Sequence, residues 1–472
     1  MTNWIAFTPE LYCTAMAIVF LVLSMGREDS PRLHFQTALT LSAIGVGVTL
    51  ASAGLKGDLF FGSYRVDAFS QVFKVLLACG FFLVVVLCSD LPGVDRRLHA
   101  EFYLLLTTST LALMLLVSSV HMLTIYVSLE LSSYSLYVLV YLRKGRPRRD
   151  RTVVQYFLIG ASASAVMVFG IALLYGGTRT MYVAEMARVL PSVMTQPAVL
   201  IGFMMTLSGF FFKLAVFPFH FWAPGVYEGS ANQLTTYIAT ASKAAAIALL
   251  VRFASLGDDS AVLAQILVVL SIITMTVGNV SAIVQQDLKR LLAYSSVAHA
   301  GYVLIGILSM NPEGYAGAIF YSIALVMLKF TCFMVVVKVA ADGANITVDQ
   351  LAGLHRRNPL LALALMLSLF GLCGIPPTIG FIGKLLVFTA AMERGYFTLV
   401  LIAMINVVIS LYYYLLVLKA AYLTEPAEEP APLVLSTGEK VLAAALIAAI
   451  TVVGFYPAPL IHVARSAAAV LL

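Results

Sequence analysis

The sequence contains few charged residues. Asp, Glu, Lys and Arg make up 11% of its 472 residues, whereas a soluble domain has roughly a quarter, and 61% of the residues are hydrophobic. This composition excludes a water-soluble fold and an intrinsically disordered chain. Five cysteines, none in a CxxC pair, and seven scattered histidines give no metal-ligand or redox spacing. With no GxGxxG after a strand either, we expect no cofactor in this chain.

Long hydrophobic runs fill the sequence instead. A run of about 20 residues crosses a bilayer as a helix, because the hydrocarbon offers no water to an open backbone. Fourteen runs are present, at 7–25, 35–54, 67–89, 101–119, 121–142, 154–176, 198–222, 233–254, 260–283, 290–310, 314–340, 359–396, 398–422 and 438–464. The alternating ten-residue segments of a membrane barrel are absent. The sequence therefore predicts an all-α polytopic membrane protein with fourteen transmembrane helices and short connectors.

Positive residues predict the orientation of these helices, because Lys and Arg in short loops stay on the cytoplasmic side. If the N-terminus is outside, the odd-numbered loops are cytoplasmic and carry most of the positive charge, including a dense cluster at 143–151. We interpret this cluster as a topology anchor rather than a patch for nucleic acid or signalling lipids. Both termini are then expected on the outer, periplasmic side of a bacterial plasma (inner) membrane.

Five charged residues interrupt the hydrophobic runs. At ~1.5 Å per residue, Glu130 and Lys243 lie about 14 and 15 Å inside their runs, near the middle of a ~30 Å hydrocarbon core. Lys213 and Lys329 lie similarly deep, and Lys384 follows a break in its run. Facing lipid, five such charges would cost roughly 15 kcal/mol, and a central lysine cannot reach the headgroups. A static pair with Glu130, the one carboxylate that the sequence places deep in a span, would neutralise a single lysine.

These charges predict a proton relay. Burial makes the ammonium form costly and a neighbouring carboxylate stabilises it, so moving the carboxylate away can release a proton. A sodium or potassium site would instead require clustered acids and carbonyls. The candidate relay residues are Glu130, Lys213, Lys243, Lys329 and Lys384. The possible accessory groups are His220 and His299, although a single helical histidine is more often a packing residue.

Prolines interrupt two runs beside a lysine. Pro218 follows Lys213, and Pro376 and Pro377 precede Lys384. One interrupted helix in each half is typical of inverted-repeat transporters, in which freed carbonyls face the substrate path. For either helix taken alone, the alternative is an ordinary proline kink. The halves also share two serine dipeptides, Ser132-Ser133 and Ser295-Ser296.

Six segments, in chain order, resemble the antiporter-like membrane subunits of respiratory complex I, and those of the N type most strongly. They are LELSSYSLYVLVYLRK (129–144), YFLIGASASAVMVFGIALLYGGT (156–178), KLAVFPFHFWAPGVYEGS (213–230), ATASKAA (239–245), DLKRLLAYSSVAHAGYVLIG (287–306) and DQLAGLHRRNPLLALALMLSLFGLCGIPPTIGFIGKLLVF (349–388). The resemblance extends from about residue 60 to 420. The L type carries a long C-terminal extension, and this chain ends after its fourteenth run, which favours the N type.

The resemblance implies a fold and a role for each relay residue. Helices 4–8 and 9–13 would form inverted five-helix repeats with helices 7 and 12 broken, which divides the chain into 1–100, 101–255, 256–422 and a C-terminal helix 14 in 423–472. Glu130 on helix 5 would tune Lys213 on helix 7. Lys243 on helix 8 and Lys329 on helix 11 would carry the proton along the membrane axis, and Lys384 on helix 12 would pass it to the far side or the next subunit.

The resemblance also implies a function. The chain would be a non-redox, membrane-arm subunit of a proton-translocating NADH:quinone oxidoreductase. NAD, flavin, iron–sulfur clusters and quinone would belong to partner subunits, and the membrane partners would be the M-type and the small K- and J-type subunits, with no nucleic acid. The alternatives are a subunit of a multi-component cation/proton antiporter or of a membrane-bound hydrogenase, and a structural scaffold.

One segment departs from the family pattern. Gly225 stands where the family has an acid, and Asn232-Gln233 replace a usual proline, so the resemblance does not predict the hydrogen bonds there. We interpret Tyr227 and Glu228, in the same VYEGS segment, as parts of a loop.

Overall fold

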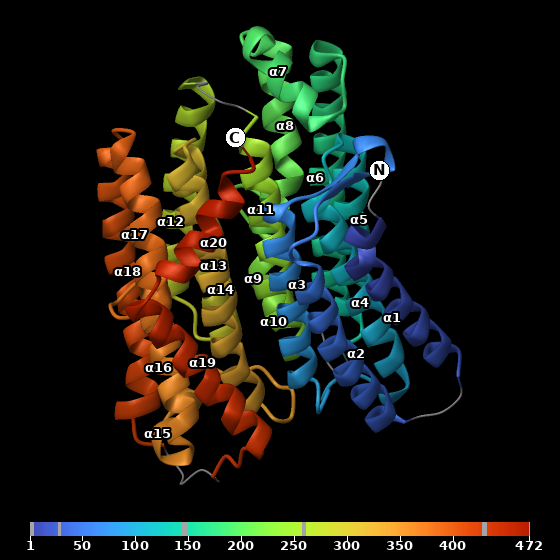
Figure 1. Ribbon diagram of the computed structural model, residues 1–472. Helices are drawn as coiled ribbons and strands as arrows, with labels where there is room; N and C mark the ends of the chain where they lie inside the picture. The colour runs from blue at the N-terminus through green and yellow to red at the C-terminus, as the bar shows by residue number, and fades with distance from the viewer. Residues whose placement is uncertain (1–3, 27–29, 144–148, 257–260, 427–431, 472) are drawn as a thin grey trace. The chain divides into compact units, whose positions relative to one another are not determined.

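The computed structural model describes residues 4–26, 30–143, 149–256, 261–426 and 432–471 (Figure 1). Contacts between residues divide the chain into two compact units. Unit 1 comprises Met1–Ala215, Gly229–Gln265 and Ser466–Leu472, and unit 2 comprises Val216–Glu228 and Ile266–Arg465. Each unit is described by itself.

Unit 1 is built from helices and one small hairpin. Its α-helices are α1 (Thr8–Met25), α2 (Pro31–Ser52), α3 (Ala68–Leu87), α4 (His99–Ser118), α5 (Met122–Tyr141), α6 (Arg149–Thr178), α7 (Val183–Val193), α8 (Pro197–Leu214), α10 (Asn232–Tyr237) and α11 (Lys243–Ala254). Short 3-10 helices cover Trp4–Phe7, Phe60–Gly62 and Arg96–Leu98, and a π-helical turn, Ile238–Ser242, joins α10 to α11. Strands β1 (Gly57–Leu59) and β2 (Tyr64–Val66) pair antiparallel, with Gly57 opposite Val66.

Glycines let two helices of unit 1 approach closely. α6 packs along α8, and Gly170 of α6 faces Gly202 of α8. A Cβ at Gly170 would lie 2.5 Å from the backbone nitrogen of Thr206, so a side chain at this position would force the helices apart. Close backbone approach through small residues is a common way of packing helices in membranes. It fixes α8, which carries one of the predicted relay lysines.

Unit 2 contains the later helices. They are α9 (Trp222–Gly229), α12 (Ala261–Ile283), α13 (Leu288–Leu308), α14 (Pro312–Val339), α15 (Leu354–Arg357), α16 (Pro359–Cys373), α17 (Ile379–Glu393), α18 (Phe397–Leu423), α19 (Thr437–Phe455) and α20 (Ala458–Ala468), with a 3-10 helix at Asp349–Leu351. The division assigns Gly229 of α9, the first residues of α12 and the last residues of α20 to unit 1. The long helix α14 contacts α13, α16 and α17 and forms the centre of this unit.

Polar caps start several helices at the ends of the hydrophobic runs. Asp67 accepts a hydrogen bond from the backbone nitrogen of Ser70 at 2.7 Å at the start of α3. Asp287 and Asn311 cap α13 and α14 in the same way. These side chains satisfy the first backbone N–H groups of a helix, which have no partner within it.

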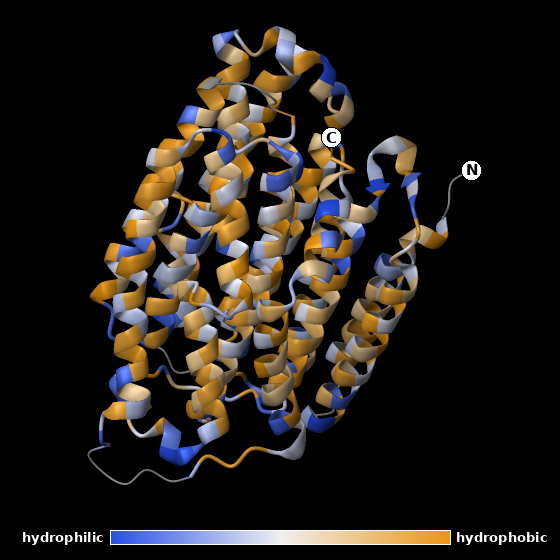
Figure 2. Cartoon of the chain, turned by 60° about the vertical axis from the view of Figure 1, so that its left-hand side comes forward, coloured by the Kyte–Doolittle hydropathy of each residue, from blue (hydrophilic) through white to orange (hydrophobic). Residues whose placement is uncertain are grey.

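The predicted fold class is confirmed. Thirteen helices of the described residues are long and apolar enough to cross a membrane, and they coincide with thirteen of the predicted runs. The remaining run, 359–396, forms two helices of 15 residues, α16 and α17. Figure 2 shows most helical segments coloured as hydrophobic. The count of fourteen spans stays a prediction, and so does the division at 100, 255 and 422.

The last hydrophobic run is divided by a proline. The run 438–464 was expected to be one helix, but α19 ends at Phe455 and α20 begins at Ala458, because Pro457 cannot continue the hydrogen-bonded ladder. That prediction is wrong for the last part of the run. In the basic cluster at 143–151, residues 144–148 lie outside the described residues.

Candidate functional site

Unit 1 holds three of the five predicted relay residues, and all three are buried. Glu130 lies in α5, Lys213 near the end of α8 and Lys243 at the start of α11. They are 8%, 2% and 6% exposed, respectively. Protein groups therefore have to stabilise these charges in place of water.

Two serines of α5 hold the ammonium of Lys213. Its Nζ donates hydrogen bonds to the Oγ of Ser132 at 2.7 Å and to the Oγ of Ser133 at 3.2 Å. Glu130 lies on the same face of α5 as Ser133, one helical turn away, and accepts a hydrogen bond from the Oγ of Ser164 in α6. None of the ion pairs among the described residues joins Glu130 to Lys213 directly. The glutamate and the lysine are thus neighbours with separate hydroxyl partners.

The end of α8 supplies a carbonyl to the next lysine. α8 stops at Leu214 because Ala215 takes a left-handed conformation, with φ of 64°, and Pro218 follows shortly after. The Nζ of Lys243 donates to the carbonyl oxygen of Leu214 at 2.9 Å. The π-helical turn at Ile238–Ser242 directly precedes Lys243, and π-turns of this kind are frequent at functional sites. The structure therefore brings Lys243 to the residue next to Lys213.

Unit 2 repeats this chemistry at its own broken helix. α16 ends at Cys373, where Gly374 has a φ of 90°, and α17 starts after the two prolines. The Nζ of Lys384, in α17, donates to the carbonyl oxygen of Cys373 at 2.8 Å. The same ammonium lies 4.6 Å from the ring centroid of Tyr302, a cation–π distance. Lys384 is 4% exposed.

The other lysine of unit 2 contacts the second serine dipeptide. Lys329, buried in α14, donates from its Nζ to the Oγ of Ser296 in α13. The hydroxyl of Tyr227 also donates to this Oγ, at 3.4 Å. Each of the two serine dipeptides found in the sequence therefore contacts a buried lysine of its own unit.

His299 lies between the surroundings of Lys329 and those of Lys384. Its Nδ1 is 2.6 Å from the hydroxyl of Tyr321, and its Nε2 is 3.3 Å from the hydroxyl of Tyr414. The Tyr414 hydroxyl is 2.5 Å from the Oγ of Ser295, next to the serine that Lys329 contacts. On its other side, the His299 ring lies 5.8 Å from that of Tyr302. Hydroxyl and imidazole groups thus line the space between the two lysines.

His220 has a different environment. It lies in the segment between α8 and α9, and its ring packs beside Phe217 and Phe221, with centroids 5.7 and 4.3 Å away. Its Nδ1 has no hydrogen-bond partner among the described residues. The structure brings His299, but not His220, into hydrogen-bond contact with the groups around the lysines.

The segment that departs from the family pattern is helical. Tyr227 and Glu228 belong to α9, so the prediction of a loop for them is wrong. Glu228 forms an ion pair with Arg290 at 2.8 Å. In unit 1, Gln233 donates from its Nε2 to the carbonyl oxygen of Asp90 at 2.8 Å. Among the described residues, no atom outside the neighbouring backbone lies within 4 Å of a Cβ built on Gly225, so there is space for the Cβ of a side chain there.

Sequence reasoning missed several partners. The relevant tyrosines, Tyr302, Tyr321 and Tyr414, sit in hydrophobic runs where tyrosine is unremarkable, and only the fold turns their hydroxyls inward. It also missed a second buried carboxylate, Glu10, and Lys74, its partner in α3, both with no exposed surface. Lys74 lies seven residues inside its run, so the signal used for the other lysines would have found it.

The described residues contain no group of three or more His, Cys, Asp or Glu side chains placed to hold a metal ion. Each of the four buried lysines predicted for the relay instead donates to a hydroxyl or to a carbonyl at the end of a helix. Buried cations beside broken helices are typical of a class, the polytopic membrane proteins that move ions or protons.

The chain belongs to the NADH:quinone oxidoreductase/Mrp antiporter transmembrane family, which matches residues 119–410. It is 60% identical over 471 residues, 100% of both chains, to NADH-quinone oxidoreductase subunit N 2 of Syntrophobacter fumaroxidans. It is similar to a chain of respiratory complex I from Thermus thermophilus, at 31% identity and a TM-score of 0.84, covering 96% of this chain and 98% of that one. A chain of the Mrp complex from Dietzia sp. DQ12-45-1b shares the fold, at 20% identity and a TM-score of 0.88, covering 100% and 98%. The resemblance found in the sequence is thereby confirmed.

Proposed function

We propose that this chain is a membrane-arm subunit of a proton-translocating NADH:quinone oxidoreductase, and that Glu130, Lys213, Lys243, Lys329 and Lys384 carry its protons. The 60% identity over the whole chain to a relative named NADH-quinone oxidoreductase subunit N 2 is the observation that supports the complex. The burial of four lysines on hydroxyl and carbonyl partners supports the relay. NAD, flavin, iron–sulfur clusters and quinone belong to partner subunits in this proposal.

The geometry of unit 1 suits a conformational control of proton affinity. Lys213 is held by serines rather than by a carboxylate, and Glu130 lies one turn away on the helix that carries those serines. A shift of α5 against α8 that brings Glu130 nearer stabilises the ammonium, and the opposite shift releases a proton toward Lys243. Moving one proton against 100 mV requires about 2.3 kcal/mol. Quinone reduction in partner subunits has to supply that energy.

The relay of unit 2 follows the same chemistry. Lys329 exchanges protons with the serines, tyrosines and histidine of α13, α14 and α18, and Lys384 stands beyond them at the free carbonyl of Cys373. In this proposal Lys384 hands the proton to the outer side or to a neighbouring subunit. The neighbours are the M-type and the small K- and J-type membrane subunits.

We place the protein in a bacterial plasma (inner) membrane with both termini on the periplasmic side. The excess of Lys and Arg in the odd-numbered loops supports this orientation. A membrane-impermeant thiol reagent tests it on a cysteine introduced at the exposed residue Val470, near the C-terminus, in a chain whose native cysteines are replaced.

A subunit of a multi-component cation/proton antiporter is the second candidate. The shared fold with a chain of the Mrp complex favours it, although 20% identity shows the fold alone. The two functions differ in their energy source. An antiporter moves protons when a sodium or potassium gradient is applied without an electron donor, whereas the proposed complex pumps only during quinone reduction.

Two substitutions in the assembled complex test the relay. Glu130→Gln and Lys243→Met keep the shape of each side chain and remove its charge. We expect NADH-driven proton pumping in proteoliposomes to fall by at least about tenfold in each, a loss of ~1.4 kcal/mol or more in the transfer barrier. Glu393→Gln and Lys419→Met, which change exposed residues of the same types, are the matched controls and should pump at the wild-type rate.

Wild-type pumping in both relay variants would contradict the relay and leave a structural scaffold as the explanation. Pumping that survives without an electron donor, driven by a sodium gradient, would contradict the complex itself.

A further inference from the structure

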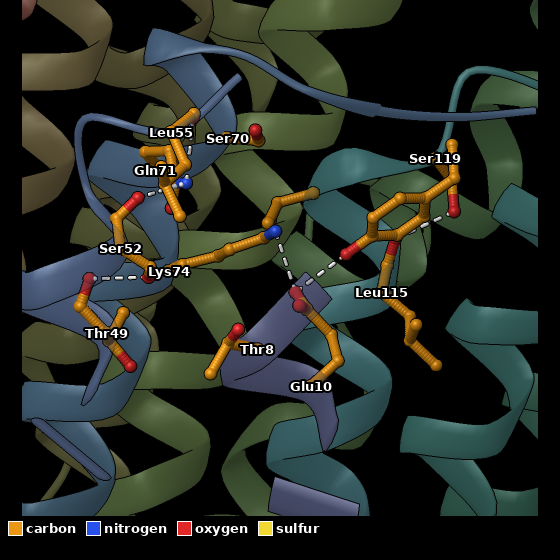
Figure 3. A network of polar contacts seen from close by, with 12 residues as sticks. Thr8, Glu10, Thr49, Ser52, Leu55, Ser70, Gln71, Lys74, Leu115 and Ser119 are labelled. Carbon is orange, nitrogen blue, oxygen red and sulfur yellow. Dashed lines mark hydrogen bonds and ion pairs between the residues drawn. The ribbon is translucent and has the colours of Figure 1, made fainter. Parts of the chain in front are cut away.

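A second buried ion pair lies in unit 1, away from the predicted relay lysines. The Nζ of Lys74, in α3, is 2.8 Å from the Oε1 of Glu10, in α1, and neither side chain has exposed surface. The hydroxyl of Tyr64, in β2, donates to the same Oε1 at 2.7 Å, and its ring centroid lies 5.2 Å from the ammonium. Figure 3 shows Lys74 and Glu10 pointing toward one another. α1, α3 and the hairpin thus enclose one acid and one base completely.

Both members of this pair can change protonation state. An amine and a carboxyl 2.8 Å apart can share or exchange a proton, and a buried pair of this kind contributes little to stability on its own. A nearby buried pair, Arg252–Asp67 at 3.0 Å, differs in this respect because an arginine in a protein stays protonated. Asp67 also caps α3, which gives that pair a structural role.

A polar run in α4 contacts both the relay side of unit 1 and α1. Thr107, Thr108, Ser109 and Thr110 form a polar run near the middle of this otherwise apolar helix. Because four consecutive helical residues point in different directions, the run reaches several neighbouring helices.

Three contacts of this run reach α5, α10 and α1. The Oγ of Ser109 donates to the carbonyl oxygen of Ser132, the serine that holds Lys213, at 3.4 Å. The hydroxyl of Thr110 lies 2.9 Å from that of Tyr237, six residues before Lys243. On the other side of α4, the Sγ of Cys13 donates to the carbonyl oxygen of Thr107 at 3.6 Å. Cys13 stands one turn of α1 after Glu10, on the same face.

We propose that Glu10 and Lys74 form an additional proton-exchanging pair, loaded from Lys213 and Lys243 across the polar run of α4. This inference rests on the proposed function. In the step, one proton leaves a relay ammonium, which becomes an amine, and binds the Glu10 carboxylate, which becomes a carboxylic acid. No electrons move, and the pair returns to neutrality when the proton leaves. The Oε2 of Glu10, which has no hydrogen-bond partner among the described residues, is the oxygen that accepts it.

A double substitution separates this role from a structural one. Glu10→Gln with Lys74→Met leaves no unpaired buried charge, so the variant complex should assemble and reduce quinone. We expect fewer protons pumped per two electrons than in the wild type, measured in proteoliposomes. A static ion pair predicts the wild-type ratio, and that result would overturn the proposal.

The pair Arg252–Asp67 provides the matched control. Arg252→Met with Asp67→Asn removes a buried pair of the same net charge between α11 and the start of α3, and we expect the pumping ratio to stay at its wild-type value. An equal fall in both double variants would contradict the assignment to Glu10, because it would reflect packing. Absence of pumping in the wild-type complex would instead contradict the proposed function, so the two failures are distinguishable.

Infrared difference spectroscopy adds a readout that does not depend on the double variant. Spectra of the oxidised minus the reduced complex should contain a carboxylic-acid C=O band from Glu10. In Glu10→Asp, which keeps the acid on a shorter side chain, this band should shift. If no carboxyl band changes in the variant, Glu10 does not take up a proton during turnover and the proposal fails.

Discussion

The ammonium of Lys243 donates to the carbonyl oxygen of Leu214 at 2.9 Å, one residue beyond Lys213. Lys243 of α11 therefore binds the last residue of α8, which directly follows Lys213. In unit 2 the ammonium of Lys384 meets the last carbonyl of α16 in the same way, at 2.8 Å. A lysine and the end of a broken helix form the shared element of both units.

The serines of α5 should set the proton affinity of Lys213. Ser132→Ala with Ser133→Ala removes both side-chain acceptors, and a hydrogen bond to a charged group contributes about 1.5–3 kcal/mol. We expect NADH-driven pumping by the assembled complex to fall about tenfold or more. Ser162→Ala, at an exposed serine bonded to its own helix, should leave pumping unchanged. Equal pumping by the double variant and the wild type would show that the serines do not hold a working ammonium.

Gly374 should be required both for its backbone conformation and for space beside Lys384. A Cβ there would lie 2.9 Å from the Cδ of Lys384, and the φ of 90° is unfavourable for alanine by about 1–2 kcal/mol. We expect Gly374→Ala to lower both thermal stability and pumping. Gly395→Ala is the control, since Gly395 has a φ of 84° with no atom near its Cβ position. It should lose stability alone, and a pumping defect in it would mean that strain rather than the lysine is responsible.

The glycine contact between α6 and α8 should be sensitive to a single methyl group. Gly170→Ala would place its Cβ 2.5 Å from a backbone nitrogen of α8, so we expect less assembled subunit in the membrane and a lower melting temperature. Gly176→Ala in the same helix meets no atom within 4 Å and should be neutral or stabilising by up to about 1 kcal/mol. Thermal unfolding of the detergent-purified complex measures both. The same melting temperature for the two variants would refute the close packing.

Tyr414 should conduct protons in unit 2 because its hydroxyl lies between Ser295 and His299. Tyr414→Phe removes the hydroxyl and keeps the ring, so we expect slower pumping with normal assembly. Tyr412→Phe changes an exposed tyrosine of the same helix and serves as the control. A defect confined to Tyr412→Phe, or none in Tyr414→Phe, would argue against this path.

Most of the fold could be predicted from hydropathy, because each span is a continuous run that needs no partner to be recognised. The error occurs where a proline ends a helix inside a run, because Pro457 separates α19 from α20. The break in the run 359–396 was expected from Pro376 and Pro377, and the two helices there end at Cys373 and begin at Ile379. The VYEGS segment was predicted to be a loop, whereas Tyr227 and Glu228 belong to the helix α9.

The candidate site was predicted from the free-energy cost of placing a charge inside the membrane. A charge in an apolar run has to be stabilised by protein groups. That argument found Lys213, Lys243, Lys329 and Lys384, all of which are buried. This argument does not identify the neutral hydrogen-bond partners of the lysines, because placing a serine or a tyrosine in a hydrophobic run costs little free energy at any position. It also passed over Glu10, whose position near the start of α1 suggests a place at the headgroups, whereas the hairpin and α3 cover it completely.

The carboxyl ends of α8 and α16 affect how mutational scans of this protein should be interpreted. The carboxyl end of a helix carries about half a negative elementary charge, which comes from aligned peptide dipoles. Because α8 and α16 end directly at Lys243 and Lys384, part of the counter-charge of each lysine belongs to the main chain. No side-chain replacement deletes it, so alanine scanning will record a smaller electrostatic contribution than the lysines experience. Replacing the peptide bond after Leu214 or Cys373 by an ester would reveal the main-chain part of the electrostatic stabilisation of each lysine.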